Sequence, residues 1–232
     1  MPLEFILETQ GLTKEFKGFV AVNNVDLKVQ RGHIHALIGP NGADITHEKP
    51  AQTALRGIVR SFQISAVFPH MTVLENVRAA LQRNLGTSFH FWKAEDTLYQ
   101  LHDRARALLA EVDLSNFADE MTVNLPYGRK RALELATTLA LEPELMLLDE
   151  PTQGMGHEDV DRVTKLIKKV SAGRTILMVE HNMGVVSSIA DRITVLQRGA
   201  IIADGPYADV SKNPLVIEAY MGTADTALQG AH

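Results

Sequence analysis

An apolar run that ends in two acids is the feature that most constrains how this chain folds. Leu145-Met146-Leu147-Leu148 is followed directly by Asp149 and Glu150, and then by Pro151. The run is too short for a buried helix, and a strand that is apolar on both faces is typical of the interior of a parallel sheet. We therefore expect two carboxylates at the carboxyl edge of such a sheet, where α/β proteins bind their ligands.

Three more apolar runs of similar length predict further strands, at residues 34–38, 176–179 and 193–196. Helical stretches separate the later runs, and in one of them, over residues 160–170, apolar residues recur at spacings of three and four. Strands that alternate with helices indicate an α/β fold in which helical crossovers join parallel strands. Short alternating strands near the N-terminus and a mainly helical middle third from Glu75 complete the predicted order.

Composition argues against several classes of function. The 23 Lys and Arg residues and 28 Asp and Glu residues leave a net charge of −5, which favours no nucleic-acid partner. The chain has no cysteine, so a disulfide framework, a thiolate zinc site and a cysteine nucleophile are excluded, and an intracellular protein is expected. We find no secretory signal and no apolar run near the roughly 18 to 20 residues that span a bilayer. A role at a membrane would therefore require docking on an embedded partner.

The acidic pair suits metal-assisted hydrolysis. One of the two carboxylates, Asp149 or Glu150, can hold Mg²⁺, usually through water, while its neighbour polarises an attacking water. A bare Asp-Glu pair is more often a solvated acidic turn. The apolar strand before the pair and Pro151 after it favour the functional interpretation.

A glycine-containing loop follows the strand predicted at residues 34–38. The segment Gly39-Pro40-Asn41-Gly42-Ala43 has the form of the front of a phosphate-binding loop, in which glycines let backbone N–H groups turn toward a phosphate. The complete pattern would continue with Gly, Lys and Ser or Thr, but the next residues are Asp44, Ile45 and Thr46. Taken alone, Gly-Pro-Asn-Gly is most often an ordinary turn.

Three further signals are weak individually and become more informative when they are taken together with the acidic pair and the glycine-containing loop. His181 comes directly after another apolar strand and could contact a phosphate or orient water, although such a histidine is more often a surface residue. Gln63 could reach Mg²⁺ or water through its carbonyl, but alone it is better explained as a surface glutamine. Tyr127 and Gly128 begin a predicted helix that carries three cations, Arg129-Lys130-Arg131. That start offers N–H groups to an anion, or is simply a basic, solvated helix end.

The order of these segments resembles the nucleotide-binding subunits of ABC transporters. The resemblance covers nearly the whole chain, from Leu12-Thr13-Lys14 to Ala219-Tyr220-Met221-Gly222. The stretches over residues 58–63 and 68–77, together with Gly154-Met155 and the closing Tyr220-Met221-Gly222, look like the branched-chain amino-acid importer subgroup. The resemblance implies a P-loop NTPase-like ABC nucleotide-binding domain, an α/β fold with an antiparallel β edge and a helical subdomain.

The resemblance also implies a role for each matching residue. Asp149 would be the Mg²⁺ carboxylate, Glu150 the catalytic base and His181 the γ-phosphate switch. Gln63 would reach Mg²⁺ and couple the nucleotide to the membrane partner, while Phe16 would stack on adenine. The remaining ATP-binding positions would be Gly39, Pro40, Asn41, Gly42, Ala43, Tyr127 and Gly128.

The implied organisation is a nucleotide-binding domain over residues 1–222, with a helical subdomain at about 72–141 and a tail at 223–232. Two nucleotide subunits, identical or paralogous, would sandwich two ATP molecules, with Tyr127-Gly128 of one subunit capping the phosphate bound by the other. Residues 153–156 would lie at the dimer seam. Transmembrane permease subunits would dock on the helical subdomain, and a periplasmic or extracellular solute-binding protein would act indirectly. The protein would be cytoplasmic, peripheral on the inner face of the cell membrane.

The capping motif departs from the family pattern. The family usually has Leu-Ser where this chain has Leu125-Pro126. Proline removes both a hydroxyl and a backbone N–H from the cap, so we expect weaker contact with the partner subunit's phosphate.

A larger departure follows Ala43, where the family continues with Gly-Lys-Thr-Thr, a helix and another strand. About two dozen residues are missing by the length that a βαβ unit needs, and the phosphate-binding lysine is among them. We expect the actual protein to contain these residues, because their loss would gravely destabilise the core. The alternative is a catalytically defective ABC-fold module that serves as a structural or regulatory partner. A soluble ABC-type ATPase of DNA repair or translation is disfavoured by the net charge of −5.

Overall fold

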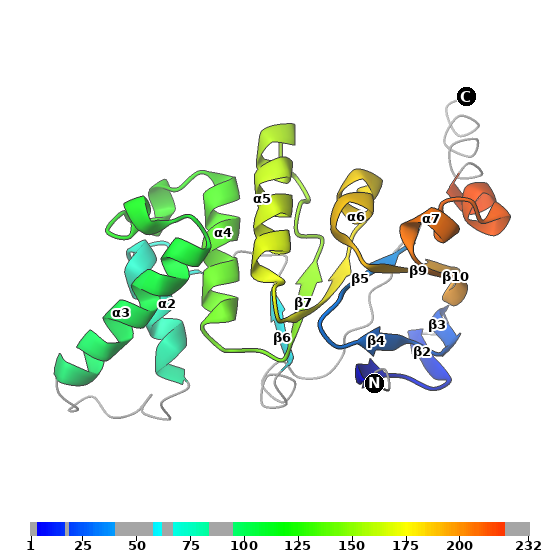
Figure 1. Cartoon of the computed structure of the whole chain (residues 1–232), viewed down its shortest axis with the longest axis horizontal. Coiled ribbons are helices and arrows are strands. Elements are labelled where there is room, and N and C mark those ends of the chain that lie inside the picture. The colour runs from blue at the N-terminus through cyan, green and yellow to red at the C-terminus, as the bar shows by residue number, and fades with distance from the viewer. Residues whose placement is uncertain (1–3, 17–18, 40–57, 62–66, 84–94, 221–232) are drawn as a thin grey trace. The chain divides into compact units, whose positions relative to one another are not determined.

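A computed structural model of the chain describes residues 4–16, 19–39, 58–61, 67–83 and 95–220 (Figure 1). The side chains of residues 16, 19, 58–61 and 95–100 are outside that description. The chain divides into two compact units, one made of residues 1–49 and 173–232 and the other of residues 50–172. The domain boundaries proposed above, at 72–141 and 223–232, stay predictions.

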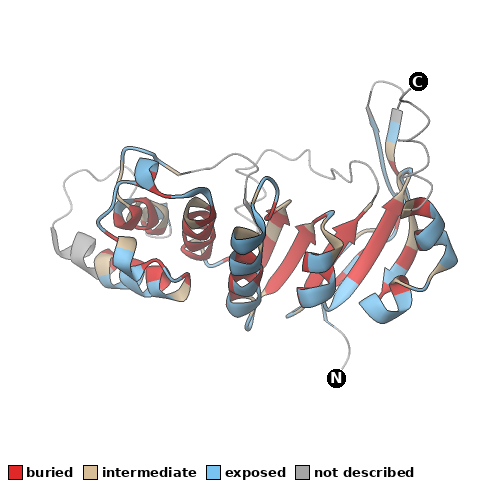
Figure 2. Cartoon of the chain, turned by 90° about the horizontal axis from the view of Figure 1, so that it is seen from above, coloured by how far each residue is buried: buried red, intermediate tan, exposed pale blue. Residues whose placement is uncertain are grey.

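The first unit is built on a mixed sheet in which four strands follow the order β10–β9–β5–β8. Their bounds are β5 (Ile34–Ile38), β8 (Thr175–Val179), β9 (Arg192–Gln197) and β10 (Ala200–Gly205). β5 pairs in parallel with both β8 and β9, while β10 runs antiparallel to β9. Every residue of β5 is buried, as an apolar run in a parallel sheet requires, and Figure 2 shows the burial along the strands. The strands predicted at 34–38, 176–179 and 193–196 are confirmed.

Two antiparallel pairs form the other strands of this unit. β1 (Phe5–Glu8) pairs with β4 (Lys28–Gln30), and β2 (Leu12–Phe16) pairs with β3 (Phe19–Val25). Val25, Leu27 and Val29 are buried while the residues between them are exposed, so burial alternates along the chain from the end of β3 into β4. The helices of this unit are α6 (Met183–Ile189), α7 (Tyr207–Val210) and a helix over residues 214–220.

The second unit combines a parallel strand pair with helices. The strands are β6 (Ile58–Ser61) and β7 (Leu145–Asp149). The helices are α2 (Val73–Gln82), α3 (Glu95–Glu111), α4 (Tyr127–Leu139) and α5 (His157–Val170), with short 3-10 turns η2 (Ser115–Phe117) and η3 (Thr122–Asn124). α2 begins at Thr72, whose side chain accepts from the Glu75 N–H while the Glu75 carboxylate accepts from the Thr72 N–H.

α5 is the crossover helix that the sequence predicts. Val163, Ile167 and Val170 are at most 1% exposed and form one buried stripe, whereas the intervening positions are largely charged. Glu158 and Asp159 lie in the first turn, where the helix dipole favours negative charge. No helix within the described part of the chain is long and apolar enough to cross a lipid bilayer.

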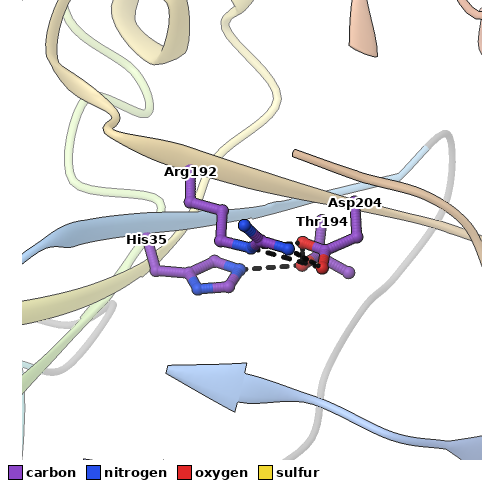
Figure 3. Close-up of polar contacts among 4 residues, drawn as sticks. All are labelled: His35, Arg192, Thr194 and Asp204. Atoms are coloured by element: carbon purple, nitrogen blue, oxygen red, sulfur yellow. Dashed lines mark hydrogen bonds and ion pairs between the residues drawn. The ribbon is translucent and has the colours of Figure 1, made fainter. Parts of the chain in front are cut away.

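A buried histidine links three strands of the first unit (Figure 3). His35 on β5 is 1% exposed, and its Nε2 lies 2.7 Å from the hydroxyl of Thr194 on β9. That hydroxyl donates to Asp204 on β10 (2.9 Å), which also accepts from Arg192. Burial lowers the pKa of His35 from 6.5 to about 4; nearby Asp204 opposes this pKa shift, and Arg192 and His33 reinforce it.

This burial makes the stability of the fold depend on pH. The pKa of His35 is higher in the unfolded chain than in the folded one, so the unfolded chain binds the proton more tightly. We expect the free energy of unfolding to be unaffected by His35 above pH 6.5 and to fall by about 3 kcal/mol as the pH drops toward 4. Urea denaturation at several pH values between 7.5 and 4.5 measures this.

The variant His35→Gln should flatten that pH dependence relative to the parent protein, whatever its stability at neutral pH. His157→Gln serves as the control, because His157 is exposed at the start of α5 and the slope should survive its replacement. An unchanged slope in His35→Gln would contradict the assignment.

Candidate functional site

In the first unit, two sequence-predicted residues lie at one edge of the sheet. β5 and β8 run parallel with Leu37 opposite Val179, and the Glu180 N–H donates to the Leu37 carbonyl at 3.2 Å. Gly39 and His181 therefore leave the carboxyl ends of two adjacent strands. This is the edge at which parallel sheets bind ligands.

The turn that carries His181 is held on both sides. Glu180 is 2% exposed, and its carboxylate accepts from the Asn182 N–H at 3.1 Å. The Asn182 side chain in turn caps α6 by accepting from the N–H groups of Gly184 and Val185. His181 itself is exposed between these two anchored residues, so its ring is presented to solvent from an ordered turn.

Packing alone requires a glycine at position 39, independently of any ligand. A Cβ built on it would lie 2.5 Å from the backbone carbonyl oxygen of Leu196 on β9. Only glycine lets the chain leave β5 this close to its neighbouring strand.

In the second unit, the two acids stand where the sequence places them. Leu145, Met146 and Leu148 are at most 1% exposed, and Asp149 and Glu150 are half-buried at the end of β7. Glu150 has φ of 44°, a left-handed conformation that costs a residue other than glycine about 1–2 kcal/mol. Such strain often occurs at functional sites, where it aims a side chain. The Gln153 N–H then donates to the Glu150 carbonyl and closes the turn.

The start of α4 presents its two predicted residues differently. Tyr127 is 51% exposed, whereas Gly128 is buried. Pro126 is the N-cap and has no side-chain cap hydrogen bond. A Cβ on Gly128 would lie 2.5 Å from Asp159 Oδ1 of α5, so a glycine allows the starts of α4 and α5 to approach closely.

The three cations of α4 do not form the open basic end that the sequence indicates. Arg129 stacks on the ring of Phe117, with 3.8 Å from its guanidinium carbon to the ring centroid. The Lys130 ammonium donates to the Val123 carbonyl at 3.1 Å. Arg131 is buried and pairs with Glu134. Any attraction for an anion here therefore comes mainly from the backbone N–H groups of the first turn.

The structure thus describes part of the predicted site. It brings Gly39 beside the His181 turn in one unit and places Asp149 next to Glu150 in the other. Pro40, Asn41, Gly42, Ala43 and Gln63 lie outside the described residues. For Phe16 only the backbone, in β2, is described.

The burial of Arg131 and its pairing with Glu134 are what sequence reasoning overlooked. Their signal was an opposite-charge pair three positions apart amid apolar neighbours at 132, 133, 135 and 136, where a solvated helix face would be polar.

The donor chemistry at the end of β7 fits a hydrated magnesium ion. Within the residues that the structure covers, no three His, Asp or Glu side chains gather as a metal-binding group. Mg²⁺ needs no such cage, because it keeps several waters and takes only one or two carboxylates together with substrate phosphates. The half-buried Asp149 carboxylate meets that requirement.

Comparison with protein families gives two matches. The family described as ABC transporter matches residues 43–153, and the family described as branched-chain amino acid ATP-binding cassette transporter matches residues 200–226.

Individual relatives extend over nearly the whole chain. It is 35% identical to the high-affinity branched-chain amino acid transport ATP-binding protein BraF of Pseudomonas aeruginosa, covering 94% of this chain and 98% of that protein. It is 32% identical to the probable branched-chain amino acid transport ATP-binding protein LivG of Archaeoglobus fulgidus, covering 97% and 98%. Among solved structures, the ADP conformation of MJ1267, an ATP-binding cassette of an ABC transporter, is 26% identical with a TM-score of 0.77, covering 94% and 99%.

The Pseudomonas protein is also longer within the aligned region. The alignment runs over 251 positions, while 94% of the 232 residues of this chain is about 218, which leaves about 33 positions without a counterpart here.

The packing of Gly39 yields a prediction that does not depend on any ligand. Gly39→Ala should lower the free energy of unfolding by about 1 to 3 kcal/mol, because the new methyl group must displace the backbone of β9. Urea denaturation without nucleotide measures the loss. Gly205→Ala is the matched control, since a Cβ there meets only side-chain atoms at 4.0 Å. Equal stability of the two variants would show that β9 does not restrict residue 39.

Proposed function

The chain belongs to the family of ATP-binding subunits of ABC transporters, and we propose that it hydrolyses ATP to drive import of branched-chain amino acids or related small solutes. The observation that carries the proposal is the end of β7, where a strand with Leu145, Met146 and Leu148 buried places Asp149 and Glu150 side by side. The names of the relatives support the cargo class, because they are branched-chain amino acid transport proteins.

Glu150 is the proposed base of the reaction. Its carboxylate would accept a proton from the water that attacks the γ-phosphate, and the left-handed backbone at Glu150 marks the end of β7 as a site of local strain. His181 would donate a hydrogen bond to the γ-phosphate from its anchored turn. Gly39, followed by Pro40 to Ala43, would contribute backbone N–H groups to the phosphates.

Asp149 is the proposed magnesium ligand, through water, and Gln63 is a second candidate. When bound, Mg²⁺ neutralises charge on the β- and γ-phosphates during transfer. Phe16 would stack against the adenine ring. These assignments extend the family resemblance to single residues.

The start of α4 is proposed to face a second nucleotide subunit, identical or paralogous. The exposure of Tyr127 supports this role, since it leaves a side chain at the start of α4 accessible to a second subunit. Pro126 supplies no hydroxyl, so this cap would rest on backbone groups. Binding of ATP would close the dimer and hydrolysis would reopen it.

Transmembrane permease subunits are the proposed membrane partners, and they would hold the protein at the cytoplasmic face of the membrane. A solute-binding protein would deliver cargo to those subunits without touching this chain. The exposed side chains of Phe68, Met121 and Val123 in the second unit offer apolar area for such docking.

None of the relatives reported above supports the alternative of a catalytically defective module. The relative from Pseudomonas has about 33 positions that this chain lacks, which is enough for a helix and a strand. Together with the departure from the family pattern after Ala43, this difference in length leads us to infer that the active protein contains a phosphate-loop lysine after Ala43.

The intact protein should then have a mass above 25.5 kDa, the mass of the 232 residues, by the weight of the additional segment. Mass spectrometry of the protein purified from its native source measures this directly. A mass of 25.5 kDa would instead favour the module that lacks a working phosphate loop.

Replacement of the proposed base should abolish turnover while preserving nucleotide binding. We expect Glu150→Gln to lower kcat by about 100-fold or more, because the amide cannot accept a proton from water. Phosphate release at saturating Mg·ATP measures kcat, and a fluorescent ATP analogue measures binding.

Glu158→Gln is the control for that experiment, since Glu158 is exposed in the first turn of α5 and its loss should leave kcat unchanged. Equal turnover of the parent protein and Glu150→Gln would reject the proposed ATPase.

A further inference from the structure

A buried ion pair within α4 has no part in the function as described so far. Arg131 Nη1 lies 2.5 Å from Glu134 Oε2, one helical turn away, and the two residues are 7% and 5% exposed. Leu133, Leu135 and Ala136 between and beside them are at most 1% exposed. The pair therefore lies in a buried part of α4 and is shielded from water.

Such a pair is a poor device for stability alone. Removing two charges from water costs about as much as their attraction returns, so apolar residues of similar volume would serve α4 equally well. A role in holding a particular geometry explains the charges better.

The second terminal nitrogen of Arg131 shows what is held. Nη2 donates to the backbone carbonyl of Asp149 at 3.3 Å. That carbonyl belongs to the peptide group joining Asp149 to Glu150, and Glu150 is the residue in the left-handed conformation. The guanidinium is planar and carries several N–H donors in fixed directions, so Glu134 on one side orients the donor that meets the peptide on the other.

We propose that Arg131 is a positioning residue for ATP hydrolysis. Clamped by Glu134, it holds the Asp149–Glu150 peptide in the orientation that aims the base at the attacking water. The inference rests on the proposed function of Glu150. It assigns to α4 a second task, the support of the end of β7 in its own subunit.

The two roles open to Arg131 make different kinetic predictions. A residue that only stabilises α4 would lower the melting temperature and leave the kcat of the folded protein unchanged. A residue that positions Glu150 would lower kcat and leave KM for ATP unchanged, because nucleotide binding does not use the base.

The main test replaces both charges together, with Arg131→Met and Glu134→Met in one protein, so that no buried charge is left without its counter-ion. We expect this double variant to fold, to keep KM within about twofold, and to lose about tenfold or more in kcat. Arg131→Lys keeps a charge beside Glu134 but lacks the planar fork, and should fall between the parent and the double variant.

The control is an exposed ion pair of the same unit, removed by Arg104→Met with Glu142→Gln. Its kcat should equal that of the parent protein. Should the Met pair fail to fold, Arg131→Lys decides: a folded protein with reduced kcat and unchanged KM supports the proposal.

The positioning role would be overturned if the folded double variant had the kcat of the parent protein. If the double variant does not fold, the same result in Arg131→Lys would overturn it. A rise in KM parallel to the fall in kcat would overturn it as well. In both cases Glu150→Gln would still be inactive and the proposed function would stand. Failure of the proposed function has a separate sign, since the parent protein itself would then turn over no faster than Glu150→Gln.

Discussion

Parallel pairing of strands that are buried on both faces is the constraint on which the rest of this structure depends. In a parallel sheet the carboxyl ends of all strands lie at the same edge. The residue that follows the last buried position of a strand is the first that can be exposed to solvent. In the first unit that rule places Gly39 beside Glu180 and His181. In the second it brings Asp149 and Glu150 to the end of β7, which pairs in parallel with β6.

The chain then uses local devices to fix what the sheet delivers. Asn182 caps α6 and Glu180 anchors the Asn182 N–H, so the histidine between them is held by its neighbours. At the end of β7 the local structure costs conformational free energy, because Glu150 adopts a left-handed backbone conformation that residues other than glycine rarely adopt. The buried guanidinium of Arg131, which meets the adjoining carbonyl, supplies a contact that can hold this conformation.

Strands, crossover helix and fold class could be predicted because each follows from hydrophobic periodicity in a short window. The run before Asp149 has no polar residue, and that alone indicates a buried parallel strand. Burial of His35 was different, since a histidine within a strand reads as polar. Its burial depends on Thr194 and Asp204, which come from strands that follow it by more than 150 residues. The left-handed backbone of Glu150 and the burial of the Arg131 side chain are likewise set by tertiary packing, which no local pattern encodes.

The proposed function requires Gly39, Asp149, Glu150 and His181 all to act on one magnesium-bound triphosphate. A crystal structure of the Glu150→Gln variant with Mg·ATP tests this most directly, through the distances from these residues to the γ-phosphate and the metal. The account predicts His181 within hydrogen-bond reach of the γ-phosphate, about 3 Å, and Asp149 at or one water from the metal. A nucleotide bound with its phosphates away from Gly39, or with Asp149 and His181 both out of reach of the γ-phosphate and metal, would contradict it.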